Sequence, residues 1–216
     1  MPQRDRVILV HGLWMYGFCM AFMQRRIERS GYDVECWSYP TVRATLRDNA
    51  EQLAEYCRRH PGSRLHIVGH SMGGLIAVSA AAAGSIPCLG RVVAAGTPLA
   101  DSFSARRLEQ LPGGRMMLGQ CISEWLHGPR IEVAATCELG VIAGRGGIGL
   151  GRLIAPDLPT PNDGVIAVEE TRIPGLRDHI VLNVSHTEML ASAAVAHQVC
   201  AFLEAGAFDA AGAGTT

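Results

Sequence analysis

The sequence predicts an α/β fold: a minimal, mostly parallel sheet of about six strands with helices on both faces. Two observations predict it. Short apolar runs rich in Val and Ile alternate along the chain with segments of helical periodicity, and these runs are typical of strands buried on both faces. In addition, 48% of the 216 residues are hydrophobic and 18% are charged, which supplies enough apolar material for a core of that size.

Six short apolar runs are the expected strands of the sheet. Four runs are strongly apolar and two are weaker. The strong runs span 6–10, 64–68, 91–95 and 179–184, and the weaker ones span 33–38 and 138–143.

The expected helices lie between these runs. Apolar residues recur at the spacing of one helix face at Leu46, Ala50, Leu53 and Cys57. An Ala-rich segment at 73–84 is expected to form a buried helix. The same spacing recurs from Met189 to Leu203, where Ser185 and Glu188 predict a capping box at the start of the last helix.

The remaining segments fit the alternation less well. Residues 101–130 mix Arg with Met, Ile and Trp, and we expect one or two amphipathic helices there, over the sheet's edge, with a small lid or none. Residues 144–164 are rich in Gly and Pro and are expected to be loop. Residues 1–206 are expected to form one domain, and the small, featureless residues 207–216 a disordered tail.

Composition and charge exclude several kinds of protein. The formal net charge is −1, which lacks the basic footprint of a nucleic-acid binder. All 19 basic residues are Arg, so Schiff-base lysines and Walker A loops are excluded. The seven Cys are odd in number and never spaced C-x-x-C, which favours reduced core thiols and predicts no metal site.

The location is expected to be cytoplasmic. The first apolar run has five residues, too few for a secretory signal peptide. The uncharged stretch 65–90 is interrupted by Gly, His and Pro, so stable membrane insertion is not expected either.

The sharpest motif is Gly69-His70-Ser71-Met72-Gly73, a G-x-S-x-G that directly follows an expected strand and directly precedes an expected helix. A serine lifted onto such a tight turn is strained, and neighbours without a Cβ allow the close approach. Ser71 is therefore predicted to be a nucleophile. The competing interpretation is a Gly-rich turn with an incidental serine.

A nucleophilic serine needs a base and an acid that orients it. His186 follows the last expected strand, so it should lie at the same sheet edge as Ser71, and it is the predicted base. Asp163 is the predicted acid because it gives the chain order Ser, Asp, His. Asp157 and Glu138 lie in or beside the same loop and remain alternatives.

The segment after the first strand is predicted to complete the site. The backbone N–H groups of Leu13 and Met72 could converge on one developing oxyanion. Trp14, Met15 and Tyr16 are candidates for the substrate pocket, although aromatic and Met residues near a strand end are as often core. The Gly-rich run 144–149 matches a dinucleotide pattern, but no helix pattern follows it, so no cofactor is predicted.

With these motifs the chain resembles the α/β-hydrolase superfamily, in particular compact bacterial lipases and esterases. The resemblance covers about residues 6–204 and rests on His11-Gly12, the elbow at 69–73, Gly96-Thr97-Pro98, Asn162-Asp163-Gly164-Val165 and Ser185-His186. It implies a Ser71, Asp163 and His186 triad. Because the first two strands of the full fold are missing, it also implies a minimal sheet.

The sequence thus predicts a serine hydrolase that cleaves carboxylic esters through an acyl-enzyme, acting on a small-molecule or lipid-like ester. Thioester cleavage or acyl transfer on the same triad is the alternative within enzymes. A catalytically silent binding module that keeps the sheet is the alternative outside them. Oligomeric state and acyl-chain length are not predicted.

Overall fold

Six strands form one sheet in the order β2-β1-β3-β4-β5-β6, and each neighbouring pair is parallel. The computed structural model describes residues 4–59, 64–147, 149 and 151–210, and every structural statement below concerns these. The strands are β1 (Arg6–Val10), β2 (Asp33–Trp37), β3 (Leu65–His70), β4 (Leu89–Ala95), β5 (Glu138–Gly144) and β6 (Asp178–Leu182). All six expected strands are present, and the predicted fold class is confirmed.

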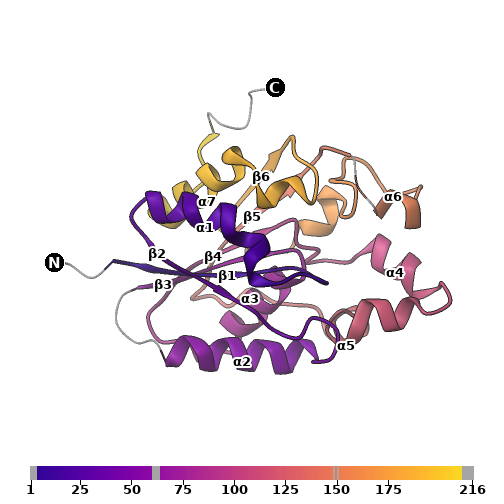
Figure 1. Cartoon of the computed structure of the whole chain (residues 1–216), viewed down its shortest axis with the longest axis horizontal. Helices are drawn as coiled ribbons and strands as arrows, with labels where there is room; N and C mark the ends of the chain where they lie inside the picture. Colours follow the sequence, from indigo (N-terminus) through magenta and orange to yellow (C-terminus); the bar gives the residue numbers. More distant parts are fainter. Residues whose placement is uncertain (1–3, 60–63, 148, 150, 211–216) are drawn as a thin grey trace.

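Helices cover both faces of the sheet, as Figure 1 shows. Alternate side chains of a strand point to opposite faces, so Ile8 and Val10 pack into one apolar layer while Val7 and Leu9 pack into the other. The first layer is shared with α2 (Leu46–Arg58), α3 (Met72–Ala82) and α5 (Gly114–His127), and the second with α1 (Ala21–Arg29) and α7 (Ala193–Ala205). None of the described helices has the length and apolar content needed to cross a bilayer.

The segment 101–130 forms two helices, α4 (Phe103–Glu109) and α5, as expected for an amphipathic stretch. Gly119 interrupts α5 with a left-handed backbone, φ 72°. A Cβ at Gly119 would lie 2.5 Å from the Cα of Val42, so only glycine allows this close approach. The break turns the second half of α5 so that Ile122 and Trp125 are buried against the core.

The C-terminal segment differs from expectation in two respects. The last helix begins at Ala193 with Ser192 as its cap, not after Ser185, because residues 188–190 form a separate 3-10 helix, η3 (Glu188–Leu190). Residues 207–210 are not a free tail: the Phe208 ring packs on Phe202, and Asp209 and Gln198 exchange two hydrogen bonds. The rest of the expected tail, 211–216, lies outside the described residues.

The carboxyl ends of the central strands lie level with one another. Val10 pairs with Gly69, and His70 pairs with Ala95. The segments after β1, β3, β4, β5 and β6 therefore emerge at one edge of the sheet, where ligands bind in open α/β folds. Three further short helices lie in connecting segments: η1 (Gly17–Met20), α6 (Gly151–Ile154) and η2 (Val168–Thr171).

Candidate active site

Ser71 occupies the turn between β3 and α3 in a conformation that non-glycine residues rarely adopt, φ 55° and ψ −125°. Such backbone strain persists only where the surroundings enforce it, and it is concentrated at functional sites. Here the neighbouring glycines make room for it. A Cβ at Gly69 would lie 2.5 Å from the Gly73 backbone, and a Cβ at Gly73 would lie 2.2 Å from the carbonyl oxygen of Val10.

The backbone of Ser71 is held on both sides by β4 and the segment after it. Its N–H donates to the carbonyl of Ala95 at 2.9 Å, and its carbonyl accepts from Thr97 Oγ1 at 3.0 Å. The strained turn therefore has a fixed position relative to the sheet.

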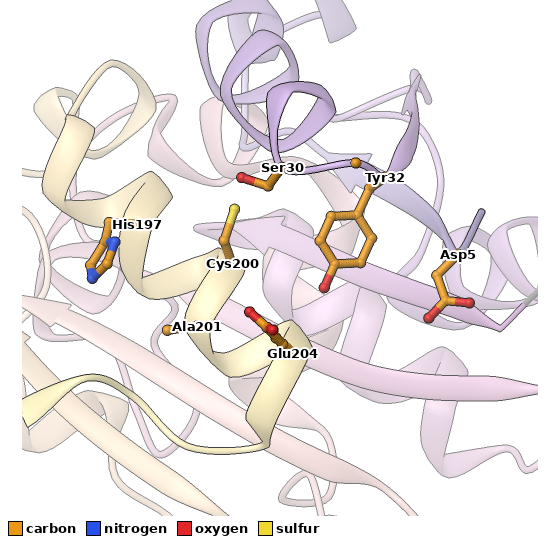
Figure 2. A pocket seen from close by; sticks show the side chains of 8 residues that line it. Asp5, Ser30, Tyr32, His197, Cys200, Ala201 and Glu204 are labelled. Carbon is orange, nitrogen blue, oxygen red and sulfur yellow. The ribbon is translucent and has the colours of Figure 1, made fainter.

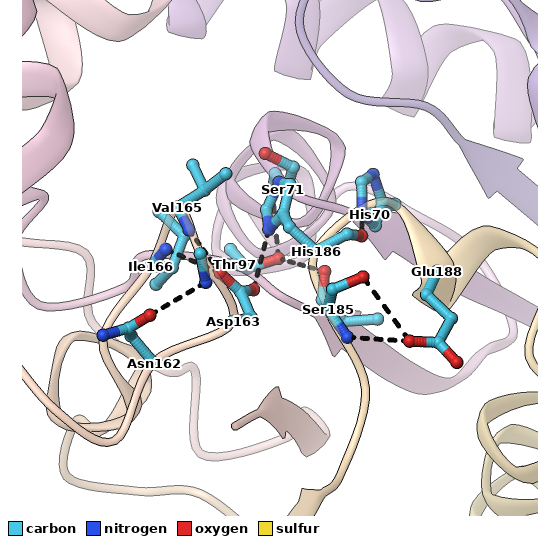
Figure 3. Close-up of polar contacts among 12 residues, drawn as sticks. His70, Ser71, Thr97, Asn162, Asp163, Val165, Ile166, Ser185, His186 and Glu188 are labelled. Atoms are coloured by element: carbon cyan, nitrogen blue, oxygen red, sulfur yellow. Dashed lines mark hydrogen bonds and ion pairs between the residues drawn. The ribbon is translucent and has the colours of Figure 1, made fainter. Parts of the chain in front are cut away.

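His186 and Asp163 form a buried pair next to this turn (Figure 3). His186 Nδ1 lies 2.7 Å from Asp163 Oδ2, and Asp163 is only 1% exposed. The other carboxylate oxygen accepts from the N–H groups of Val165, at 2.9 Å, and Ile166, at 2.7 Å. Because a carboxylate only accepts, Nδ1 carries the imidazole proton, and Nε2 is left with its lone pair free to act as a base.

The alternative acids lie elsewhere. Asp157 pairs with Arg107 at the surface, and Glu138, at the amino end of β5, pairs with Arg91 at 2.7 Å. Three other described histidines have contacts or positions apart from the His186–Asp163 pair. His66 lies inside β3, His179 contacts Thr171 at 2.8 Å, and His197 contacts Asp209 at 3.0 Å.

Ser71 and His186 both line one pocket of about 220 Å³ at the carboxyl edge of the sheet. Leu13, Met72, Trp14 and Met15 line it too. Among the described residues, the backbone N–H groups of Leu13 and Met72 have no hydrogen-bond acceptor. Two free amide donors therefore accompany the serine.

Tyr16 was predicted to line the pocket, and it does not. It is 66% exposed, does not line the pocket, and stacks on Phe18 at 6.0 Å between ring centroids. The chain turns sharply before it, because Trp14 has a left-handed backbone with φ 59° and its indole N–H donates to the carbonyl of Met117 at 3.0 Å. Trp14 and Met15 stay at the pocket while Tyr16 points away.

Sequence reasoning missed most of the pocket wall. The wall comes from α4, α5, α6 and the acid-bearing loop, and its apolar members are Ala105, Leu108, Leu118, Ile122, Trp125, Ile154, Val165 and Ile166. The period of apolar residues in 101–130 indicates a helix but not which distant element it covers. No local signal identifies these residues.

A second pocket, of about 610 Å³, lies beside the amino end of β1 and is shown in Figure 2. Asp5, Ser30, Tyr32, His197, Cys200 and Glu204 are among its lining residues. Burial raises the pKa of the Cys200 thiol, so the nucleophilic thiolate is disfavoured there. Over the described part of the chain, no cluster of three or more His, Cys, Asp or Glu side chains could hold a metal ion.

Comparisons with known proteins identify the family and agree with the fold. Residues 7–135 match the family model described as the alpha/beta hydrolase family. The mature Bacillus licheniformis lipase BlEst2 is similar in structure, with a TM-score of 0.76 and 17% identity over 95% of this chain and 94% of that one.

Two further structures show the same fold. A metagenomic carboxyl esterase has a TM-score of 0.64 and 19% identity, over 84% of this chain and 64% of that one. The RedJ thioesterase of the Streptomyces coelicolor prodiginine pathway has a TM-score of 0.61 and 15% identity, over 94% and 85%. No curated protein matches the chain. At these identities the likeness shows the fold alone.

Proposed function

Since the chain belongs to the alpha/beta hydrolase family, we propose that it is a serine hydrolase that cleaves carboxylic esters through an acyl-enzyme. One observation carries this proposal. A serine on a strained strand-to-helix turn shares a pocket with a histidine whose Nδ1 lies 2.7 Å from a buried carboxylate. Each feature alone has a structural explanation, whereas a nucleophile, a base and an orienting acid in this chain order form the constellation of a catalytic triad.

In the proposed mechanism, Ser71 Oγ attacks the ester carbonyl carbon while His186 Nε2 accepts the hydroxyl proton. The tetrahedral oxyanion accepts hydrogen bonds from the N–H groups of Leu13 and Met72. His186 then returns its proton to the departing alcohol oxygen, and the C–O bond breaks to leave an acyl-Ser71. Water, deprotonated by His186, attacks the acyl carbon, the bond from that carbon to Ser71 Oγ breaks, and His186 returns the proton to Oγ as the carboxylic acid leaves. Asp163 keeps His186 in the productive tautomer throughout.

The pocket favours an uncharged, apolar acyl group of short to medium length. No Asp, Glu or Arg side chain is among the described residues that line it. Besides Ser71, two serines line it, and both are engaged: Ser104 Oγ donates to the carbonyl of Val165 at 2.6 Å, and Ser102 Oγ accepts from the N–H of Ala105 at 3.2 Å. A volume near 220 Å³ lies below the roughly 300–1,000 Å³ of sites that hold drug-sized ligands.

Labelling with a fluorophosphonate tests the nucleophile. We expect the wild-type protein to be labelled at one site per chain and Ser71→Ala to lose both the label and all hydrolysis of p-nitrophenyl butyrate. Ser79→Ala, in the middle of α3, is the matched control and should keep both. A labelled Ser71→Ala variant would place the nucleophile elsewhere. A wild-type protein that is neither labelled nor active would instead support the silent binding module.

Thioester cleavage on the same triad is the second candidate. Apolar walls that exclude water suit a thioester, and a structural neighbour carries the name thioesterase. The values of kcat/KM for an ester and a thioester with the same butyryl group separate the two candidates. A preference of more than about tenfold for the thioester, equal to about 1.4 kcal/mol of transition-state binding, would favour the alternative.

A further inference from the structure

The main chain of His186 is held from two sides, by the loop residue Asp163 and by His70 at the end of β3. Its N–H donates to the carbonyl of Asp163 at 2.9 Å. Its own carbonyl accepts from Nε2 of His70 at 2.9 Å. The base is therefore attached by its backbone to the segment carrying the acid and to the residue that precedes the nucleophile.

His70 is the last residue of β3 and is directly bonded to Ser71 in the chain. Its ring is 2% exposed and lies 4.8 Å from the ring of His186, centroid to centroid, at an interplanar angle of 50° (Figure 3). The backbone of His70 is fixed by pairing with Ala95 on β4. One short and rigid side chain thus spans the gap between the nucleophile's strand and the base's loop.

We propose that His70 is a positioning residue: the hydrogen bond from its Nε2 to the His186 carbonyl sets where the base lies relative to the Ser71 hydroxyl. This inference rests on the proposed function and goes beyond it, because it assigns a role outside the triad. A base displaced by about 1 Å can lose on the order of 10²-fold in rate, so such a tie has a measurable effect.

The chemistry of the His70 imidazole allows this hydrogen bond to persist over a wide pH range. A carbonyl only accepts, so Nε2 must carry the proton. Burial, and secondarily the nearby His186, lowers the pKa of His70 to about 3, so the ring stays neutral and keeps one donor at neutral and mildly acidic pH. Nδ1 has no hydrogen-bond partner among the described residues. The His186 carbonyl is thus the one hydrogen-bond partner that the ring loses on substitution.

Three variants test the proposal. His70→Phe keeps a ring but removes the donor. His70→Gln can present its own Nε2–H to the same carbonyl. His66→Phe is the matched control, since His66 lies on the same strand, is 0% exposed, and also makes one backbone hydrogen bond, accepting from the N–H of Arg91 at 3.0 Å. His66 lies toward the amino end of β3, away from the pocket.

The measurements are kcat and KM for p-nitrophenyl butyrate and the rate of fluorophosphonate labelling, each corrected for the folded fraction by circular dichroism. We expect His70→Phe to lower kcat and the labelling rate by about 10- to 100-fold with KM changed less than about threefold. His70→Gln should recover to within about fivefold of wild type, and His66→Phe should stay within about twofold. An unimpaired His70→Phe, an unrescued His70→Gln or an equally slow His66→Phe would each overturn the proposal.

A measurement on the wild-type protein covers the case in which His70→Phe does not fold. The ¹⁵N chemical shifts of labelled histidines identify which ring nitrogen is protonated. We expect His70 to carry its proton on Nε2 from pH 5 to pH 8, and an Nδ1–H tautomer would contradict the inferred bond. Failure of the proposed function would give a different result from failure of the His70 proposal, because the wild-type protein itself would then not be labelled by fluorophosphonate.

Discussion

Gly96 lies against the acid and the base, and its left-handed backbone disfavours any residue with a Cβ. A Cβ there would lie 3.1 Å from His186 Nδ1 and 3.3 Å from Asp163 Oδ2, and φ is +57°. Gly96→Ala should therefore press on the 2.7 Å bond between the two side chains. We expect kcat for p-nitrophenyl butyrate to fall by about 10- to 100-fold, as for other small displacements of catalytic groups.

Gly84→Ala is the matched control for this substitution. Gly84 has a similar φ of +65°, but nothing lies within 4 Å of an added Cβ. Both variants should lose about 1–3 kcal/mol of unfolding free energy from the left-handed backbone. Only Gly96→Ala should lose activity, and equal kinetics in the two variants would show that the contact with the pair has no catalytic consequence.

The assignment of the acid makes a second prediction for single residues. Asp163→Asn keeps the size of the side chain but no longer enforces the Nδ1–H tautomer of His186, so kcat should fall by about 10³- to 10⁴-fold. Asp157→Asn removes a surface ion pair with Arg107, which contributes about 0–1 kcal/mol, and should leave kcat unchanged. The reverse result, a slow Asp157→Asn and a fast Asp163→Asn, would contradict the proposed triad.

Some residues of the site could be predicted from the sequence and others could not. Ser71 was identifiable from the sequence because its strain requires glycines at fixed offsets, and the structure brings His186 and Asp163 together as expected from their places after strands. Their catalytic roles stay predictions. The prediction that Tyr16 lines the pocket was wrong because the chain turns at Trp14, a left-handed position that is not occupied by glycine and so has no signal in the sequence. His70 carries no local signal of its contact with His186, since the two are 116 positions apart.

At the scale of elements, α5 forms one wall of the pocket and should control acyl-chain length. Leu118 lines the pocket and is buried. Leu118→Ala removes three side-chain carbons from this wall, so we expect the acyl chain of the preferred p-nitrophenyl ester to become longer by up to about three carbons. The measurement is kcat/KM across esters from acetate to palmitate.

Leu126 supplies the control on the same helix. It is also buried but does not line the pocket. Leu118→Ala and Leu126→Ala should each lose about 2–5 kcal/mol of unfolding free energy, and only the first should shift the chain-length optimum. If both variants keep the wild-type chain-length optimum, α5 does not limit the length of the acyl chain.

The sequence predicts the elements of this fold more reliably than their ends. The central strands β1, β4 and β5 are compact runs of β-branched and small apolar residues buried on both faces, so their pattern is local. The start of the last helix was misplaced because Glu188 accepts from the N–H of Ser185, as in a capping box, without a long helix following it. The docking of Phe208 was missed because it depends on a distant contact with Phe202.

At the scale of the whole molecule, buried histidines make stability depend on pH. Burial is the main cause that lowers the pKa of His66 to about 4 and that of His70 to about 3. In the unfolded chain both should titrate near 6.5. Between about pH 6 and pH 4 the unfolded state therefore binds more protons than the folded state, and the free energy of unfolding must fall as pH falls.

Each such histidine lowers the free energy of unfolding by about 1.4 kcal/mol per pH unit once the pH is well below 6.5 and still above its own folded pKa. Urea unfolding at pH 7.0, 6.0, 5.5 and 5.0 measures this slope, and staying at pH 5.0 or above limits the titration of carboxyl groups. In His66→Phe the slope should decrease by about 1.4 kcal/mol per pH unit, because one proton no longer binds on unfolding. An unchanged slope in this variant would mean that His66 is already protonated in the folded protein, in disagreement with its complete burial on β3, a central strand of the sheet.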